Sequence, residues 1–251
     1  MNGKLLLMPN ALDLGAEPGD LREVLPLPVI EKAAQLAHWV VEDARSARAF
    51  LKRVAAFAPL KQALQVIDIR DLPKPRKGSL DVVPQAQWQA LLQPALAGHD
   101  IGLLSEAGLP AVADPGAALV QAAHELGVQV LPLAGASSIL LALAASGLNG
   151  QSFAFVGYLP QEAAARAARL RELEAHTRRQ QQTQLMIETP YRNAVLLAAL
   201  LAVLSPTTRL SVSCGLTLPQ GWTRTDSVAV WRARPSAMPD RLPAVFALLA
   251  G

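Results

Sequence analysis

Short apolar runs alternate with stretches of helical spacing in the first half of the chain. The apolar runs predict strands over residues 4–8, 39–41, 65–69, 101–105 and 128–132. The intervening apolar positions recur at helical spacing and predict helices over residues 29–38, 46–57, 85–96 and 117–126, with an extended, proline-containing linker over 72–84. Because strands and helices alternate, this half is expected to fold around a parallel sheet.

The pattern changes in the second half, where strands outnumber the helices that could connect them. Strands are predicted over residues 153–158, 184–187, 209–214 and 227–231, and helices over 138–146, 162–176, 193–204 and 241–249. Strands outnumber the crossover helices between them towards the end of the chain, and this favours a mixed sheet. The sequence therefore predicts two α/β domains, residues 1–134 with a mostly parallel sheet and residues 135–251 with a mixed sheet.

A long loop over residues 106–116 is the most informative segment, because strand-to-helix connections usually need only a few residues. It carries two carboxylates, Glu106 and Asp114, among glycines and prolines. A second bend of small residues, 133–137, follows the next strand along the chain, and we expect the two strands to be neighbours, with both bends at one edge of the sheet. Small residues let backbone groups approach a ligand closely, although turn geometry alone would also explain them.

Composition narrows the class of protein. The chain has 251 residues, of which 51% are hydrophobic and 4% aromatic, so a folded, helix-rich α/β protein is expected. Its longest apolar stretch is too short to span a bilayer, and we expect a cytoplasmic protein without a membrane partner. With a single cysteine, Cys214, and four histidines without shared spacing, no metal site is expected. The formal net charge of +3 is too small to require a nucleic acid partner.

Several motifs occur together in an order that resembles one known family. They are Glu-Asp-Ala-Arg at 42–45, Ser-Glu-Ala-Gly-Leu-Pro at 105–110, Asp-Pro-Gly at 114–116, the bend at 132–137, Ser-Gly-Leu at 146–148, Gly-Tyr-Leu-Pro at 157–160 and Glu-Thr-Pro-Tyr-Arg at 188–192. The chain resembles the tetrapyrrole methylase superfamily, in particular the branch that contains ribosomal RNA small subunit methyltransferase I. The resemblance covers most of the chain and is most specific between Ser105 and Leu148.

The resemblance implies a methyltransferase that uses S-adenosyl-L-methionine, holds it between two α/β domains and forms a homodimer. The residues that it implies for cofactor binding are Glu106, Ala107, Gly108, Leu109, Pro110, Val112, Ala134, Gly135, Ala136, Ser137, Phe155, Glu188, Leu216 and Thr217. No metal is implied.

The implied methyl acceptor is a ribose 2'-hydroxyl of small-subunit ribosomal RNA, so the expected partner is this RNA or the small ribosomal subunit. Residues expected to contact the substrate are Glu42, Asp43, Arg45, Tyr191 and Arg192. For the first three, an alternative of equal weight is a surface ion pair that caps the next helix. No catalytic base is assigned; the candidates by position are Glu42, Asp43, Glu106, Asp114 and Glu188.

The chain departs from the family pattern at its N-terminal loop, which keeps the proline at Pro9 but lacks the usual Gly-Asn pair. The resemblance therefore supports the cofactor more strongly than it supports the substrate. Two alternatives stay open: a methyltransferase that acts on a tetrapyrrole or another small molecule, and a cofactor-binding protein without transfer activity.

Overall fold

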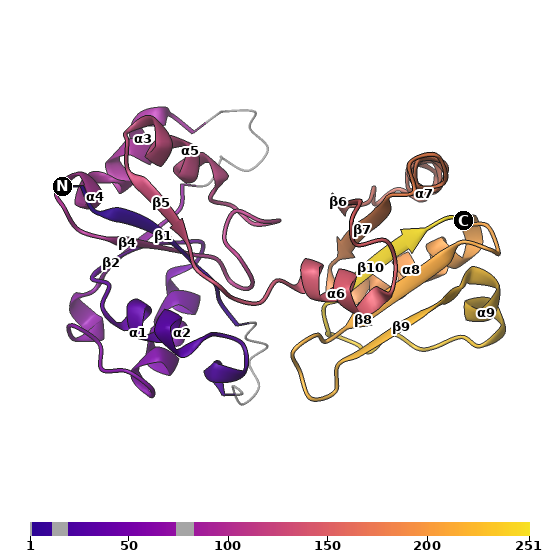
Figure 1. The fold of residues 1–251 in the computed structure, drawn as a ribbon, viewed down its shortest axis with the longest axis horizontal. Coiled ribbons are helices and arrows are strands. Elements are labelled where there is room, and N and C mark those ends of the chain that lie inside the picture. Colours follow the sequence, from indigo (N-terminus) through magenta and orange to yellow (C-terminus); the bar gives the residue numbers. More distant parts are fainter. Residues whose placement is uncertain (1, 12–19, 74–82) are drawn as a thin grey trace. The chain divides into compact units, whose positions relative to one another are not determined.

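The computed structural model describes residues 2–11, 20–73 and 83–251 (Figure 1). The chain divides into two compact units, Met1–Ala136 and Ser137–Gly251. The division falls two residues after the boundary expected from the sequence. Most of the expected linker 72–84 lies outside the described residues.

In the described part of unit 1, five parallel strands form one sheet in the order β3-β2-β4-β1-β5. The strands are β1 (Lys4–Met8), β2 (His38–Val41), β3 (Asp68–Asp71), β4 (Ile101–Leu104) and β5 (Gln129–Pro132). Helices cover both faces of this sheet (Figure 1). They are α1 (Leu27–Ala34), α2 (Ala44–Ala55), α3 (Gln85–Leu91), α4 (Gln93–Leu96) and α5 (Ala117–Glu125), with single 3-10 turns at Leu21–Glu23 and Leu64–Val66.

Alternation along the strands divides the core of unit 1 into two layers. Leu6 and Met8 face the layer that contains the apolar residues of α1 and α2, whereas Leu5 faces the layer that contains those of α5. Trp39 is 1% exposed and packs edge-on against Phe50 of α2, with ring centroids 6.0 Å apart. The inner strands β2 and β4 are almost completely buried and are nearly continuous apolar runs, as expected for a parallel sheet, whereas the edge strand β3 is polar and partly exposed.

Unit 2 contains a mixed sheet in the order β6-β7-β10-β8-β9. Its strands are β6 (Phe153–Tyr158), β7 (Thr183–Glu188), β8 (Arg209–Cys214), β9 (Trp222–Ser227) and β10 (Ala244–Leu249). Its helices are α6 (Ser138–Ser146), α7 (Ala163–Gln180), α8 (Asn193–Val203) and α9 (Val228–Ala233), and a 3-10 turn spans Pro190–Arg192. Only β6 and β7 pair in parallel among the described strands of this unit. These two sheets confirm the predicted fold class.

The two faces of the second sheet are covered differently. Helices α7, α8 and α9 pack on one face, around Phe246, Trp231 and Cys214. Burial raises the pKa of the Cys214 thiol, in agreement with an inert core cysteine. Helix α6 packs on the other face, against Leu185 and Val245.

Two secondary-structure predictions for unit 2 are wrong. The predicted strand 227–231 is helical, because Ser227 ends β9 and its hydroxyl accepts a hydrogen bond from the Val230 N–H at 3.3 Å, which caps α9. The predicted helix 241–249 contains the central strand β10, which is buried on both faces. A short apolar run buried on both faces shows no periodicity that separates strand from helix.

Three predictions for unit 1 also need correction. The segment 65–69 contains a 3-10 turn and only the start of β3, and the predicted helix 29–38 ends at Ala34, before His38 begins β2. Strands β4 and β5 are not neighbours, because β1 lies between them. Both strands are parallel to β1, so their following loops still emerge at the same edge of the sheet.

Replacing Phe246 by alanine should lower the free energy of unfolding by about 3–5 kcal/mol, because the ring is fully buried in the central strand. Phe153→Ala is the matched control: it removes the same ring from the edge strand β6, where the residue is 40% exposed, and should cost less than about 1 kcal/mol. Denaturant unfolding followed by circular dichroism measures both. Equal losses would contradict the central position of β10.

Candidate functional site

The carboxyl edge of the sheet in unit 1 gathers the segments that carry most of the predicted site residues. The chain leaves this edge after β1, β2, β4 and β5. Ligands of open α/β sheets bind outside the carboxyl ends of the strands, so this edge is the candidate functional site of the unit.

Asn10, which sequence reasoning missed, joins β1 to the long loop 106–116. The backbone N–H of Asn10 donates to the Gly108 carbonyl, and the Asn10 carbonyl accepts the return bond from the Gly108 N–H, both at 2.9 Å. Its buried side-chain amide donates to the carbonyls of Ser105 and Glu106, each at 3.0 Å. The one sequence signal for this role is a polar residue two positions after a buried strand, and the strand order decides which groups it reaches.

Pro9 connects the same segment to the second bend. A Cβ atom at Gly135 would lie 2.3 Å from the Cβ of Pro9, a separation that no real side chain tolerates. Gly135 is therefore required by close packing against Pro9. The Pro9–Asn10 segment lies between the two bends and contacts both, so the structure brings Gly108 and Gly135 to one edge through a third segment.

The long loop contains backbone strain. Two alanines have positive φ, Ala111 at 65° and Ala113 at 66°, a region that residues with a Cβ rarely adopt. Val112, which lies between them, is 46% exposed. Such strain persists only where surrounding contacts hold it and often occurs at ligand sites.

The acidic residues after β2 have different roles. The carboxylate of Asp43 accepts hydrogen bonds from the Arg45 N–H at 3.1 Å and the Ser46 N–H at 3.3 Å, and so caps α2. For Asp43, the structure therefore supports the alternative to substrate contact, in which the Glu-Asp-Ala-Arg motif caps the next helix. The Glu42 carboxylate instead accepts from the Glu106 N–H at 3.2 Å, which links the segment after β2 to the long loop.

Three carboxylates influence one another at this edge. The pKa of Asp114 is raised from 3.8 to about 6, first by its partial burial and then by the negative charges of Glu42 and Glu106. The Ser105 hydroxyl, at the end of β4, is buried and has no hydrogen-bond partner among the described residues. The edge therefore has negative charge that a cationic ligand would offset, and a hydroxyl that can donate to or accept from a polar group.

The predicted site residues of unit 2 fall into two groups. Phe155 and Leu216 both pack against the cluster around α6. Ser137 is buried at the N-terminus of α6, and Thr217 is exposed with φ at 68°. The cluster brings β6, α6 and the chain after β8 together.

The second group lies at the end of β7. Glu188 is buried and forms an ion pair with Arg192 at 3.4 Å, while its carboxylate also accepts from the Thr189 N–H at 2.8 Å. Tyr191 is 79% exposed. The Glu-Thr-Pro-Tyr-Arg motif therefore forms a local turn held by one internal ion pair, with the tyrosine directed to solvent.

Within residues 2–11, 20–73 and 83–251, no cluster of His, Cys, Asp or Glu has the composition of a metal site. Searching the same residues for a helix long and apolar enough to cross a membrane finds none.

A comparison with protein-family models matches residues 29–225 to the Tetrapyrrole (Corrin/Porphyrin) Methylases. This match covers most of the chain, so the chain belongs to the tetrapyrrole methylase family, a family of methyltransferases. The resemblance inferred from the motifs is confirmed.

Curated relatives carry the name expected from the motifs. The chain is 39% identical over 120 residues to ribosomal RNA small subunit methyltransferase I of Vibrio cholerae, an alignment that covers 48% of this chain and 40% of that protein. It is 32% identical over 156 residues to the Bacillus subtilis protein of the same name, covering 61% of this chain and 52% of the relative. The chain thus spans about half or less of the length of these relatives.

Solved structures share the fold. The structure of the methyltransferase CobJ has a TM-score of 0.57 and 18% identity, covering 99% of this chain and all of the other. Uroporphyrin-III-C-methyltransferase from Thermus thermophilus has a TM-score of 0.50 and 20% identity, covering 99% of this chain and 93% of the other.

We expect Asp114→Asn to stabilise the chain above pH 6. The folded chain holds this proton more tightly than the unfolded chain, so ionisation of Asp114 lowers stability as the pH rises from about 4 to about 6. After allowance for solvent screening, the gain should be about 1 kcal/mol at pH 8 and close to zero at pH 3.5. Unfolding of wild type and variant at both pH values measures the difference. Asp71→Asn, at an exposed position on β3, is the control, and a gain that does not depend on pH would contradict the electrostatic cause.

Asn10→Ala should lower the free energy of unfolding by about 2–3 kcal/mol, because the buried Ser105 carbonyl and the partly buried Glu106 carbonyl lose their donor. It should also speed hydrogen exchange at the Gly108 and Glu106 amides by more than tenfold. Unchanged exchange at these amides would contradict the role of Asn10 in holding the loop.

Proposed function

We propose that the chain is a methyltransferase that uses S-adenosyl-L-methionine and transfers the methyl group to a ribose 2'-hydroxyl of small-subunit ribosomal RNA. The observation that carries this proposal is the family match over residues 29–225. The names of the curated relatives support small-subunit ribosomal RNA as the substrate, and a ribose 2'-hydroxyl as acceptor is consistent with them. A cytoplasmic homodimer is part of the same proposal.

The carboxyl edge of unit 1 has chemistry that fits such a cofactor. The loop 106–110 and the bend 134–136 present small residues and backbone groups at one edge, as an extended ligand held by the main chain requires. The charges of Glu42, Glu106 and Asp114 favour a cation, and the Ser105 hydroxyl, which no described residue engages, can bond to a polar group. When bound, S-adenosyl-L-methionine supplies an activated methyl group on a positively charged sulfur.

The chain's own contribution to transfer is positioning and disposal of one proton. As the acceptor oxygen bonds to the methyl carbon, the carbon–sulfur bond breaks and the hydroxyl proton must leave. The pKa of Asp114, raised to about 6, suits a proton acceptor near neutral pH, and this carboxylate is therefore our choice. Glu42 is already engaged with a backbone N–H.

Titration calorimetry tests the cofactor. The wild-type chain should bind S-adenosyl-L-methionine with saturable heat, and Gly135→Ala should weaken binding at least tenfold, since the new Cβ must displace Pro9. Gly150→Ala is the control, because a Cβ there meets nothing within 4 Å. Folded wild-type protein that binds neither the cofactor nor S-adenosylhomocysteine would contradict the proposal.

Labelled methyl transfer tests the acceptor and the proton acceptor. Small ribosomal subunits should receive label on a ribose oxygen, and Asp114→Asn should lower the rate at saturating cofactor by about a hundredfold, a loss larger than the weakening of cofactor binding that removal of its charge causes. Label found instead on an added tetrapyrrole would contradict RNA as the acceptor and support a small-molecule acceptor. Binding without transfer to any acceptor would favour the cofactor-binding protein without activity.

A further inference from the structure

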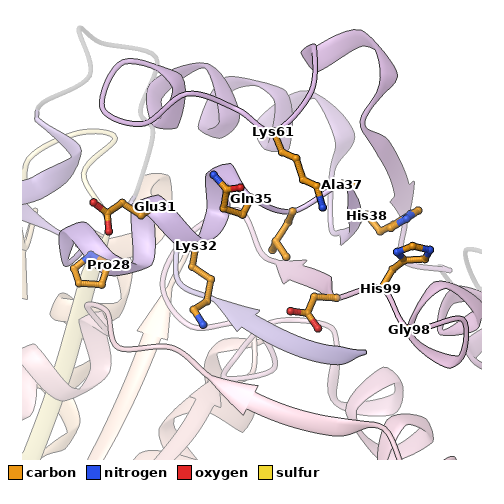
Figure 2. Close-up of a pocket in the computed structure, with 11 residues that line it drawn as sticks. Pro28, Glu31, Lys32, Gln35, Ala37, His38, Lys61, Gly98 and His99 are labelled. Atoms are coloured by element: carbon orange, nitrogen blue, oxygen red, sulfur yellow. The ribbon is translucent and has the colours of Figure 1, made fainter. Parts of the chain in front are cut away.

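A cavity of about 560 Å³ lies at the amino edge of the sheet in unit 1, the edge opposite to the candidate site (Figure 2). It is bordered by the start of β2, the segment before β4 and one side of α1 along its length. Its volume is in the range of pockets that bind small molecules. The polar side chains that line it are Glu31, Lys32, Gln35, His38, Lys61, His99 and Asp100.

Two lysines contribute cationic groups to this cavity. Among the described residues, neither Lys32 nor Lys61 has a carboxylate within ion-pair distance. Glu31 lies at the Pro28 end of the cavity, away from Lys61 and the histidines (Figure 2). The two ammonium groups are therefore available to an oxyanion.

Two imidazole rings lie together at the other end. His38 and His99 have ring centroids 5.4 Å apart and an interplanar angle of 41°. Nδ1 of His38 lies 3.2 Å from the Asp68 carboxylate, which fixes the ring and leaves its other nitrogen for a second partner. Burial would raise the pKa of Asp68, but hydrogen bonds from Arg70 and His38 lower it, so this carboxylate is ionised beside the ring.

Asp100 adds an acceptor. One oxygen of its carboxylate accepts the Lys4 N–H at 2.8 Å, which positions the group and leaves the second oxygen available to the cavity. Carboxylates and imidazoles are common partners of sugar hydroxyls, whereas lysines bind phosphate as point charges.

From these groups we infer that the cavity binds a small phosphate ester that carries hydroxyl groups, such as a sugar phosphate or a nucleoside monophosphate. Lys32 and Lys61 bind the phosphate, and His99 and Asp100 bind the hydroxyls. The formal charges of the two lysines are balanced by Glu31 and Asp100. This balance favours a small ligand of mixed character over a nucleic acid strand, whose binding depends on uncompensated cations. The inference stands apart from the proposed function, because it concerns the opposite edge of the sheet.

Titration of the full chain with ribose 5-phosphate, ribose and inorganic phosphate tests the inference. Ribose 5-phosphate should bind saturably and at least tenfold more tightly than either part alone. The double variant Lys32→Gln/Lys61→Gln should weaken this binding at least tenfold, whereas Lys52→Gln, at an exposed position on α2, should change it less than twofold. His99→Ala should weaken ribose 5-phosphate binding but leave that of inorganic phosphate unchanged.

The outcomes separate the alternatives. Absence of saturable binding, or binding that the double variant does not change, would overturn the inference. Binding of a short single-stranded RNA with no binding of ribose 5-phosphate or adenosine monophosphate would also overturn it, in favour of a polynucleotide contact. All variants should keep their unfolding midpoint, and binding of S-adenosyl-L-methionine is measured separately, so failure of one proposal does not affect the other.

Discussion

The candidate site of unit 1 depends on the hydrogen bonds of Asn10. Strand β1 lies between β4 and β5, so the chain that leaves it must pass between the two bends at the carboxyl edge. Asn10 exchanges backbone bonds with Gly108 and satisfies two carbonyls with its buried amide, while Pro9 packs against Gly135. A buried amide that lost these partners would be costly, so the contacts hold the long loop in one conformation despite the strained backbone at its alanines.

That rigidity has an electrostatic consequence. A loop free to move would carry Glu106 and Asp114 away from Glu42, because like charges repel and water screens them better apart. Held in place, Asp114 is partly buried and lies near the charges of Glu42 and Glu106, and its pKa rises to about 6, first through burial and then through these charges. A positive charge that enters this edge offsets the repulsion between the carboxylates. The same contacts that order the loop therefore also make the edge favour a cation.

The elements of the fold were predictable where local signals and packing agree. Strand β1 and helix α6 have the predicted bounds, the latter because Gly147 ends the helix in the left-handed region with φ at 63°. Strand β10 was predicted as a helix, since its apolar residues are good helix formers and only its pairing with β7 and β8 makes it a strand. Pairing with distant strands decides whether such a segment forms a strand or a helix, and the local sequence carries no signal for that pairing.

The same limit explains which parts of the sites were predictable. Glycines and prolines mark the two bends in the sequence, but the contacts of Asn10 and of the two histidines depend on strand order. Because β2 pairs with β4, residues that follow the two strands meet at one edge, where the Glu42 carboxylate accepts the Glu106 N–H. The starts of the two strands meet at the other edge, where His38, the first residue of β2, lies beside His99. A single strand pairing therefore generates both the candidate methyltransferase edge and the cavity opposite it. Histidines 61 positions apart show no spacing pattern, since the pairing and not the sequence interval brings them together.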